Sequence, residues 1–347
     1  MDRIVRLDVE QAPRVSVVMA AYDAAEFLRQ AIDSILRQTF GDFEFIIVDD
    51  GSADDTAAIV RSYADPRIRL VQNQRNLGLA RALNMGIDAA RGEYIARMDA
   101  DDESLPTRFE EQVRFLDAHP EIGLCGTQIE TMGARVERWI FECEPKRLKA
   151  HLLFSTSMSH PSVMFRRSVA ETHGLRYDPA YPLTQDYALW VCFSRVTDIA
   201  NLPQILVRYR LHGQSASSTK RAQQQEISDG VRRQQLQRLG IEPAPKQMII
   251  HTTLMRGTPH TLALDVDEAE AWLVSLLEAN RRSGVYDQAA LLDVIYEMWF
   301  KLCRAHRQTL GSAYRRFLES DIAREMFWAN RIADGTRLFL LSRSKAA

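Results

Sequence analysis

Strand and helix signals alternate at short intervals through the first hundred residues. The strand signals are short β-branched and aromatic runs, and a stretch with apolar residues at helical spacing follows each of the first three. Strands joined by helices in this way favour a parallel sheet with helices on both faces. Ligands of such sheets bind at the carboxyl ends of the strands. We predict strands over 15–20, 43–48, 68–71 and 93–98, with helices over 26–38, 54–64 and 79–90.

The rest of the chain divides into a looser α/β stretch and a helical one. A polar segment with turn chemistry, 213–218, separates the two. We therefore expect an α/β domain over 1–215 and a mainly α-helical C-terminal region over 216–347. The elements predicted beyond residue 100 are a helix over 108–118, strands over 162–165 and 205–210, a Gln/Arg-rich helix over 222–239, and amphipathic helices within 265–345.

Three carboxylates, those of Asp99, Asp101 and Asp102, follow the fourth predicted strand directly. Carboxylates this close repel one another unless a cation lies among them, and hard oxygen ligands suit Mg²⁺ or Mn²⁺. A divalent ion there would bridge and neutralise a diphosphate. The alternative is a cluster that caps a helix beginning near Pro106, whose dipole also favours acids. The position after a buried strand favours the metal site.

Two further acids occupy positions that suit a ligand site. Asp50 lies in the turn after the second strand, where it accepts a hydrogen bond from a nucleotide base or only caps the turn. Asp186 precedes an apolar helix and acts either as a cap or as a general base within reach of a hydroxyl. His160, His212 and Arg81 are isolated, and spacing alone assigns them packed or surface positions.

Composition and charge exclude some classes of partner and compartment. The formal net charge is -2, so we expect no nucleic-acid partner. The four cysteines show no CxxC spacing, which is typical of unpaired thiols in a reducing compartment. No apolar run reaches the roughly 20 residues of a membrane-spanning helix, and the N-terminus lacks the apolar segment of a signal peptide. We expect a cytoplasmic protein and leave peripheral contact with the inner face of the membrane open.

Eight short motifs follow one another over roughly the first 215 residues. They are SVVMAAYD at 16–23, SILRQTF at 34–40, IIVDDGS at 46–52, NLGLARALNMG at 76–86, GEYIARMDADD at 92–102, HPSVMF at 160–165, QDY at 185–187 and YRLH at 209–212. In this order and at this spacing they resemble the family-2 glycosyltransferases. That resemblance implies a GT-A fold, which is a Rossmann-like, mostly parallel sheet flanked by helices.

On the donor side, the resemblance implies a nucleotide site at the ends of the first, second and fourth strands. The backbone at Ala20 and the ring of Tyr22 would line the base. Asp50 would accept a hydrogen bond from the base, usually uracil. Asp99 would contact the ribose or a metal-bound water, and Arg81, by a looser match, would meet the diphosphate.

For the cofactor and the acceptor, the resemblance implies a second set of roles. Asp101 would be the main ligand of Mn²⁺ or Mg²⁺, with Asp102 supporting the loop. His212 would help to hold the metal or the diphosphate. Asp186 would be the catalytic base, and His160 would shape the acceptor side.

Three positions depart from the family's pattern. Ala20 stands where the family usually has Pro, and Asp23 where it has Asn. Asp23 adds an acid near the base-binding loop and leaves the choice of donor open. Gln185 replaces the family's glutamate before the base, which keeps the hydrogen-bonding shape and removes a charge. We therefore expect Asp186 to be less crowded electrostatically.

Together these roles imply an inverting transfer from a nucleotide-sugar, by family habit a UDP-sugar, to the hydroxyl of a glycan or lipid-linked acceptor. The product would be a polysaccharide, a glycolipid or a surface glycan. A sugar nucleotidyltransferase is one alternative, but its Gly-rich, basic loop is absent, since 21–25 reads AYDAA. A non-catalytic nucleotide-binding module is another, yet Asp99, Asp101 and Asp186 are all present.

Three roles stay open for the C-terminal region: an acceptor platform, a surface for homo-oligomers, and a face that rests on a membrane. The segment 337–345 is apolar with basic flanks, which suits interfacial binding. The alternative is a last helix packed on the core.

Overall fold

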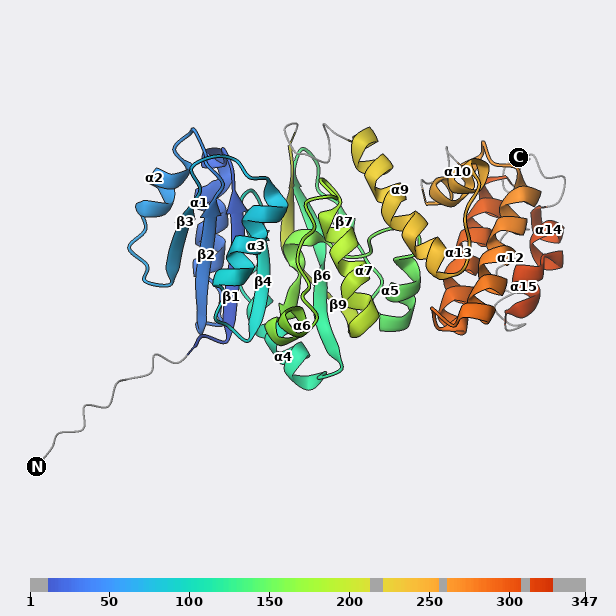
Figure 1. The fold of residues 1–347 in the computed structure, drawn as a ribbon, viewed down its shortest axis with the longest axis horizontal. Helices are drawn as coiled ribbons and strands as arrows, with labels where there is room; N and C mark the ends of the chain where they lie inside the picture. The colour runs from blue at the N-terminus through green and yellow to red at the C-terminus, as the bar shows by residue number, and fades with distance from the viewer. Residues whose placement is uncertain (1–11, 213–220, 256–260, 307–312, 327–347) are drawn as a thin grey trace, which may run out of the picture. The chain divides into compact units, whose positions relative to one another are not determined.

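The computed structural model describes residues 12–212, 221–255, 261–306 and 313–326 (Figure 1). The chain forms two compact units, one of Met1–Phe141 with Met158–Thr219 and one of Glu142–Ser157 with Lys220–Ala347. The segment Glu142–Ser157 therefore groups with the C-terminal helices, whereas a division at residue 215 places it with the α/β domain. The predicted linker 213–218 and the segment 337–345 lie outside the described residues.

Within its described residues, the first unit is built on one mixed sheet of nine strands, in the order β3-β2-β1-β4-β8-β6-β9-β5, with β7 beside β6. The neighbours in β3-β2-β1-β4 pair in parallel, and so do β6 and β9. In chain order the strands are β1 (Val15–Ala21), β2 (Phe43–Asp49), β3 (Ile68–Gln72), β4 (Tyr94–Asp99), β5 (Glu103–Ser104), β6 (Ile122–Gly133), β7 (Arg138–Trp139), β8 (Met164–Arg166) and β9 (Asp198–Leu211).

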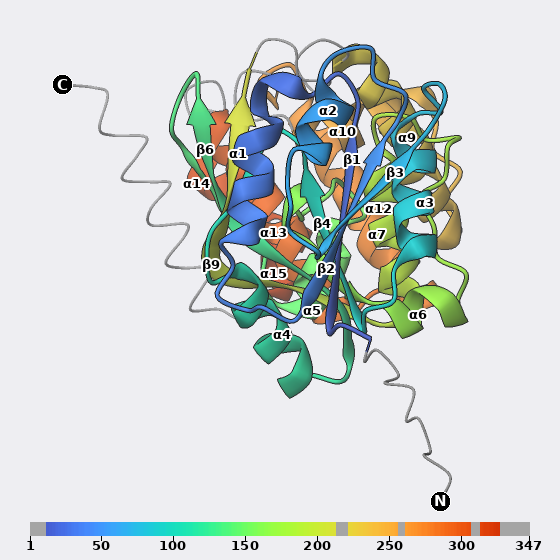
Figure 2. The ribbon, with the colours of Figure 1, turned by 90° about the vertical axis from the view of Figure 1, so that its left-hand side faces the viewer.

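Helices cover both faces of the β1–β4 part of the sheet (Figure 2). On one face, Val17 and Met19 of β1 share a buried core with Ile32 of the first helix. On the other, a Cβ at Gly86 would lie 2.4 Å from Cγ1 of Val18, so only glycine permits this close approach. The helices of this unit are α1 (Ala25–Leu36), α2 (Thr56–Arg61), α3 (Leu79–Ala89), α4 (Arg108–Ala118), the 3₁₀ helix η1 (His160–Ser162), α6 (Arg167–Thr172) and α7 (Gln185–Val196).

The predicted strands and helices before residue 120 are present, with one clear difference in length. Helix α2 begins at Thr56 rather than at residue 54, because the carboxylate of Asp54 accepts from Thr56 N at 3.0 Å and from Ala25 N at 3.0 Å. Beyond residue 120 the prediction was less complete. Strand β6 was missed, the strand predicted over 162–165 is η1 followed by β8, and β9 begins at Asp198 rather than at residue 205.

The second unit is mainly α-helical, as predicted. Its core is apolar and includes Leu273, Leu276 and Trp299. Leu153 and Phe154 belong to the same core, which explains why Glu142–Ser157 groups with helices far away in the sequence. The helices are α5 (Pro145–His151), α9 (Arg221–Arg238), α10 (Pro245–Thr253), α12 (Val266–Ser283), α13 (Gln288–Ala305), α14 (Ala313–Glu319) and α15 (Asp321–Glu325).

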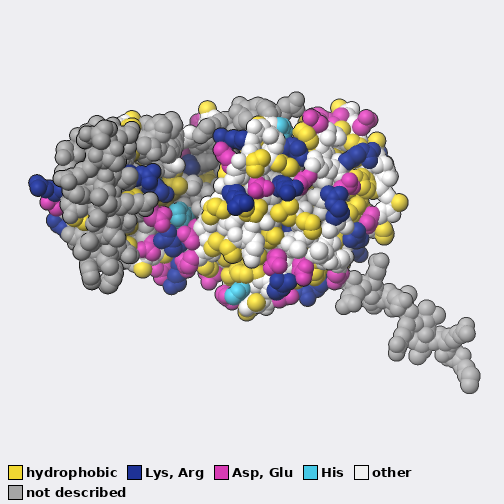
Figure 3. All heavy atoms as spheres, turned by 180° about the vertical axis from the view of Figure 1, so that it is seen from behind, with side chains coloured by type: hydrophobic (Ala, Val, Ile, Leu, Met, Phe, Trp, Pro, Cys, Tyr) yellow, Lys and Arg dark blue, Asp and Glu magenta, His cyan; other side chains and the backbone are white. Residues whose placement is uncertain are grey.

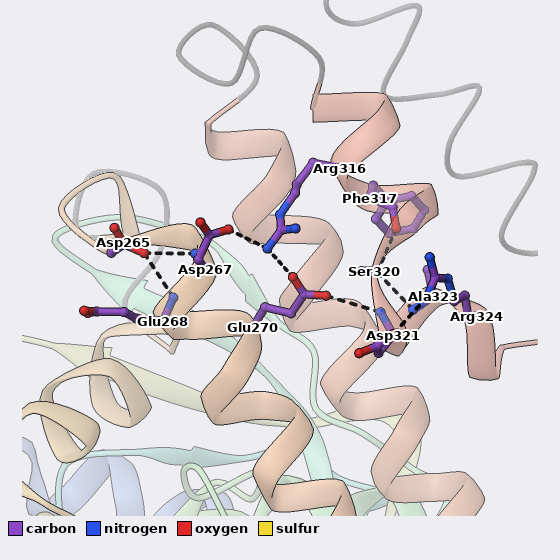
Figure 4. Close-up of polar contacts among 10 residues, drawn as sticks. All are labelled: Asp265, Asp267, Glu268, Glu270, Arg316, Phe317, Ser320, Asp321, Ala323 and Arg324. Atoms are coloured by element: carbon purple, nitrogen blue, oxygen red, sulfur yellow. Dashed lines mark hydrogen bonds and ion pairs between the residues drawn. The ribbon is translucent and has the colours of Figure 1, made fainter.

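Polar contacts attach the short helices α14 and α15 to α12 (Figure 4). The guanidinium of Arg316 lies between the carboxylates of Asp267 and Glu270, with 2.5 Å from Nη2 to Asp267 Oδ1. Glu270 also accepts from Asp321 N at 3.2 Å. Ser320 Oγ accepts from Ala323 N and so caps α15.

Surface and helix composition add two observations. Acidic and basic side chains are interspersed on the face drawn in Figure 3, where the described residues form no broad patch of one sign. Among the helices that the structure describes, none has the length and apolar character needed to cross a bilayer.

His251 on α10 is fully buried in the helical unit. Its Nε2 lies 3.0 Å from the carbonyl oxygen of Leu153, and its Nδ1 lies 3.3 Å from Nε1 of Trp272. An indole N–H can only donate, so Nδ1 is the acceptor and Nε2 carries the proton. Burial is the main reason that the pKa of His251 is lowered to about 4.

We predict that the helical unit loses up to about 3 kcal/mol of stability as pH falls from about 6.5 to about 4. The folded pKa lies below the unfolded one, so the unfolded chain takes up the proton first. Protection of the α10 and α12 amides from hydrogen exchange, corrected for intrinsic rates, measures this loss. The loss should shrink in His251→Gln and persist in the exposed control His173→Gln. Equal pH dependence in wild type and His251→Gln would contradict the assignment.

Candidate active site

The three acids predicted to bind a metal meet in one cluster where β4 ends. Carboxylate oxygens of Asp99, Asp101 and Asp102 lie within 4.8 Å of one another. The chain then enters β5, and α4 begins only after Thr107, which is its N-cap residue. The acids therefore do not cap α4, and that alternative is excluded.

Charge repulsion and burial act together on this cluster. Burial, followed by the charges of Asp99 and Asp101, holds the pKa of Asp102 well above its ordinary value. Burial also raises the pKa of Asp99, although the neighbouring Arg97 opposes that change. Asp102 Oδ2 is buried and has no hydrogen-bond partner among the described residues. A divalent cation fits this cluster, because its positive charge would offset the repulsion among the three carboxylates and stabilise the buried, unpaired oxygen.

The end of β9 holds the acidic loop in place. Arg210 donates from its backbone N to Asp102 Oδ1 at 2.7 Å and from Nε to the carbonyl oxygen of Asp101 at 2.7 Å. Its Nη2 donates to Gln30 on α1, and its guanidinium lies 4.5 Å from the centre of the Phe27 ring. His212 Nε2 lies 2.8 Å from Asp101 Oδ2. The structure thus brings together His212 and Asp101, the two predicted metal ligands.

Asp50 lies at the end of β2 and organises the loop before α3. It accepts from Asn73 Nδ2 at 2.8 Å, from Leu77 N at 3.0 Å and from Gly78 N at 2.8 Å. All three donors come from the loop before α3, and Asp50 does not cap α2. The N–H of Leu77 is shared between both carboxylate oxygens, at 3.0 and 3.1 Å, so three donors use the roughly four acceptor positions of Asp50.

The loop after β1 is fixed to the loop after β2. Asp23 has φ +45°, a region that Asn and Asp tolerate, so it can replace the family's asparagine. Its backbone N donates to Ser52 Oγ, and its Oδ1 accepts from Ala53 N at 2.9 Å. Tyr22 beside it is 50% exposed. Ala20 pairs with Asp99 in the sheet, so the loop predicted to line the base and the three acids lie at one edge.

Arg81 lies on the exposed surface of α3, where its Nη1 donates to the carbonyl oxygen of Leu77 at 3.3 Å. This contact places it beside the loop that Asp50 organises. Within the described residues, Arg81 forms no hydrogen bond or ion pair with the acidic cluster.

The predicted base, Asp186, lies in the first turn of α7, after the N-cap residue Thr184 and the buried Gln185. Burial raises the pKa of Asp186, while the backbone N–H of Tyr187 and the charge of Arg97 lower it. The charge of Asp99 contributes to the raised pKa of Asp186 as well. Asp186 is therefore not the N-cap residue of α7, and the catalytic role remains a prediction.

The predicted acceptor-side residue, His160, is paired with a tyrosine. His160 Nε2 lies 2.9 Å from Tyr177 Oη, and burial lowers the pKa of the imidazole well below its ordinary value. Asn84 of α3 fixes Tyr177 by bonding both its carbonyl oxygen and its N–H, at 2.8 and 2.9 Å. The charge of Asp186 also acts on Tyr177.

Sequence analysis missed Arg97, Tyr177 and Arg210 as members of this site. The sequence did offer a reason to include Arg97, because a positively charged residue inside a predicted buried strand needs a partner. Arg210 lay inside the YRLH motif but had no assigned role. Tyr177 lies outside every motif, so nothing local marked it.

Solved structures share this fold. TarS from S. aureus, solved in complex with UDP, matches with a TM-score of 0.55 and 15% identity, covering 91% of this chain and 91% of that one. The mannosyltransferase PcManGT from Pyrobaculum calidifontis, solved with GDP-Man and Mn²⁺, matches with a TM-score of 0.53 and 19% identity, over 97% of this chain and 89% of that one. The fold is the GT-A fold of glycosyltransferases.

Sequence comparison gives the family. Residues 16–174 match the family described as "Glycosyl transferase family 2". An uncharacterized glycosyltransferase of Haemophilus influenzae is 32% identical over 251 residues, which cover 67% of this chain and 78% of that protein. The succinoglycan biosynthesis protein ExoO of Rhizobium meliloti is 34% identical over 193 residues, or 52% of this chain and 56% of that protein. This chain belongs to glycosyl transferase family 2 and is a glycosyltransferase.

We predict that Arg210→Met weakens Mn²⁺ binding by about tenfold, because the charged hydrogen bond from Nε to the carbonyl oxygen of Asp101, worth about 1.5 kcal/mol, no longer holds the acidic loop, while the backbone bond to Asp102 remains. Calorimetric titration with Mn²⁺ measures this. Arg208→Met is the matched control on the same strand, since the exposed Arg208 pairs with Glu103 and not with the acidic cluster. Equal weakening in both variants would mean that Arg210 has no special part in positioning the loop.

Proposed function

We propose that this glycosyltransferase moves a sugar from a nucleotide-sugar donor to the hydroxyl of a glycan or lipid-linked acceptor, with inversion at the anomeric carbon. The observation that carries the proposal is the cluster of Asp99, Asp101 and Asp102 at the end of β4, where His212 Nε2 lies 2.8 Å from Asp101 Oδ2. Asp186 in the first turn of α7 supplies a separate carboxylate. An acidic metal-binding group and a separate carboxylate base are the two functions that such a transfer requires.

A UDP-sugar is the proposed donor. Ala20 and Tyr22 would line the base, and Asp50 would accept a hydrogen bond from a base N–H. Asp99 would meet the ribose or a metal-bound water, and Arg81 the diphosphate. TarS, which shares the fold, was solved with UDP. PcManGT was solved with GDP-Man, so a GDP-sugar is the second candidate.

Mn²⁺ or Mg²⁺ is the proposed cofactor, held by Asp101 and His212, with Asp102 supporting the loop. The presence of Mn²⁺ with PcManGT supports this choice. When bound, the cation supplies positive charge against the diphosphate as it leaves.

The chain's own residues would perform the proton transfer. Asp186 accepts the proton of the acceptor hydroxyl as its oxygen attacks the anomeric carbon. The bond from that carbon to the diphosphate oxygen breaks, and its electron pair leaves with the nucleoside diphosphate. Attack from the face opposite the leaving group inverts the centre. Gln185 and His160 would shape the space in which the acceptor lies.

Polysaccharide, glycolipid or surface-glycan synthesis is the proposed setting, since ExoO is named for succinoglycan biosynthesis. We place the enzyme in the cytoplasm, with peripheral contact at the membrane. Among the described residues the cysteines form no disulfide, as suits a reducing compartment. The C-terminal helices would form an acceptor platform or a homo-oligomer surface.

Replacing the base tests the mechanism. We predict that Asp186→Asn lowers kcat by about 10²- to 10⁴-fold, the usual contribution of a general base, with little change in the affinity for UDP. Asp178→Asn, on an exposed loop, should retain wild-type kcat. The raised pKa of Asp186 shifts the acidic limb of kcat/KM to a higher pH than an ordinary aspartate gives. Unchanged turnover in Asp186→Asn would rule out this assignment.

Metal dependence has its own test. A screen of UDP-, GDP- and dTDP-sugars with Mn²⁺, Mg²⁺ or a chelator should identify one nucleotide class, turned over only with metal. We predict that Asp101→Ala lowers this turnover by at least about 100-fold, which reflects several kcal/mol of lost charge stabilisation. Asp88→Ala, at an exposed ion pair on α3, is the control. Full activity with chelator would refute the cofactor.

A further inference from the structure

Arg97 is a buried cation whose hydrogen-bonding capacity is only partly used. Its side chain lies in β4, is 2% exposed, and forms one ion pair, from Nη2 to Asp99 Oδ1. The two remaining nitrogens, Nε and Nη1, are buried and lack a hydrogen-bond partner in the part of the chain that the structure describes. Buried charged donors without partners are costly, so these two N–H groups call for an acceptor from a ligand.

The strand directs Arg97 toward the base rather than toward α1. Tyr94, Ala96 and Met98 of β4 face the core that includes α1, so the alternate residues Arg97 and Asp99 face the other side of the sheet. On that side the charge of Arg97 acts on His160, Tyr177 and Asp186. The guanidinium is therefore paired with Asp99 and lies close enough to Asp186 for its charge to act on that carboxylate.

The surroundings select the class of ligand. Asp99, Asp102 and Asp186 all act electrostatically with Arg97, so a further anion would meet three carboxylates. Neutral oxygen acceptors avoid that repulsion and still match the planar N–H fork of arginine. Trp190 contributes another buried donor, Nε1, which has no partner among the described residues, and its ring packs 6.0 Å from that of His160. A sugar offers several neutral hydroxyl oxygens, so a sugar is the class of ligand that suits the unpaired donors of Arg97 and Trp190.

We propose that Arg97 binds hydroxyl groups of the transferred sugar through Nε and Nη1 and so contributes to donor specificity. This inference rests on the proposed function, since in that reaction the sugar must lie between its diphosphate and the base. Arg97 would contact the sugar and leave the nucleotide to other residues.

The experiment compares the nucleoside diphosphate with the intact donor. The donor is the one that wild type turns over fastest among UDP-glucose, UDP-galactose, UDP-N-acetylglucosamine and GDP-mannose. Titration calorimetry with Mn²⁺ measures both affinities in wild type, in Arg97→Lys and in the exposed control Arg114→Lys. Arg97→Lys keeps the charge beside Asp99 but loses the fork. It should weaken the intact donor by about tenfold or more and the free diphosphate by less than about twofold.

Donors that lack one hydroxyl at a time identify the contact in wild type itself. At least one deoxy donor should bind about tenfold more weakly than the parent, and Arg97→Lys should no longer distinguish the two. Equal loss of donor and diphosphate in Arg97→Lys overturns the proposal, and so does a wild type indifferent to every deoxy donor. A wild type that neither binds nor turns over any of the four donors overturns the proposed function as well.

Discussion

Mutual repulsion among the carboxylates at the end of β4 sets the conditions that the surrounding structure must meet. Asp99 is balanced by Arg97 from its own strand, and Asp101 and Asp102 are held by Arg210 and His212 from the end of β9. The two strands are not neighbours in the sheet. The repulsion among the carboxylates is therefore offset by contacts with residues far away in the sequence, and these contacts fix where β9 must end relative to β4.

The alternation of side chains along β4 separates two tasks. The α1 side, with Gln30, Phe27 and Arg210, supports the acidic loop mechanically. The opposite side carries Arg97 together with His160, Tyr177 and Asp186. In the proposed reaction, the support of the acidic loop and the handling of the sugar occupy opposite sides of one strand and meet at its end, where Asp99 faces the same side as Arg97. Substitutions on one side can then alter one task without the other.

Local sequence patterns predicted the β1–β4 region well because each element there has its own periodicity and turn residues. The acidic run was also predictable, since its position follows from a single buried strand. The partners of Asp50 were not, because they come from residues 73–78 in another loop. Nor could local pattern show that Leu153 packs with helices more than a hundred residues later, or that Asp198 already begins β9. Such features depend on tertiary contacts.

The contact between Asp101 and His212 spans 111 positions of the chain. During synthesis the acids emerge from the ribosome long before the strand that holds them, so the early chain exposes an acidic loop with no clamp. Closing so long a loop costs entropy that only the completed sheet recovers. The acidic site is therefore completed late in folding. An incomplete chain in which β1, β2 and β4 have already formed still lacks the end of β9 and has no finished site.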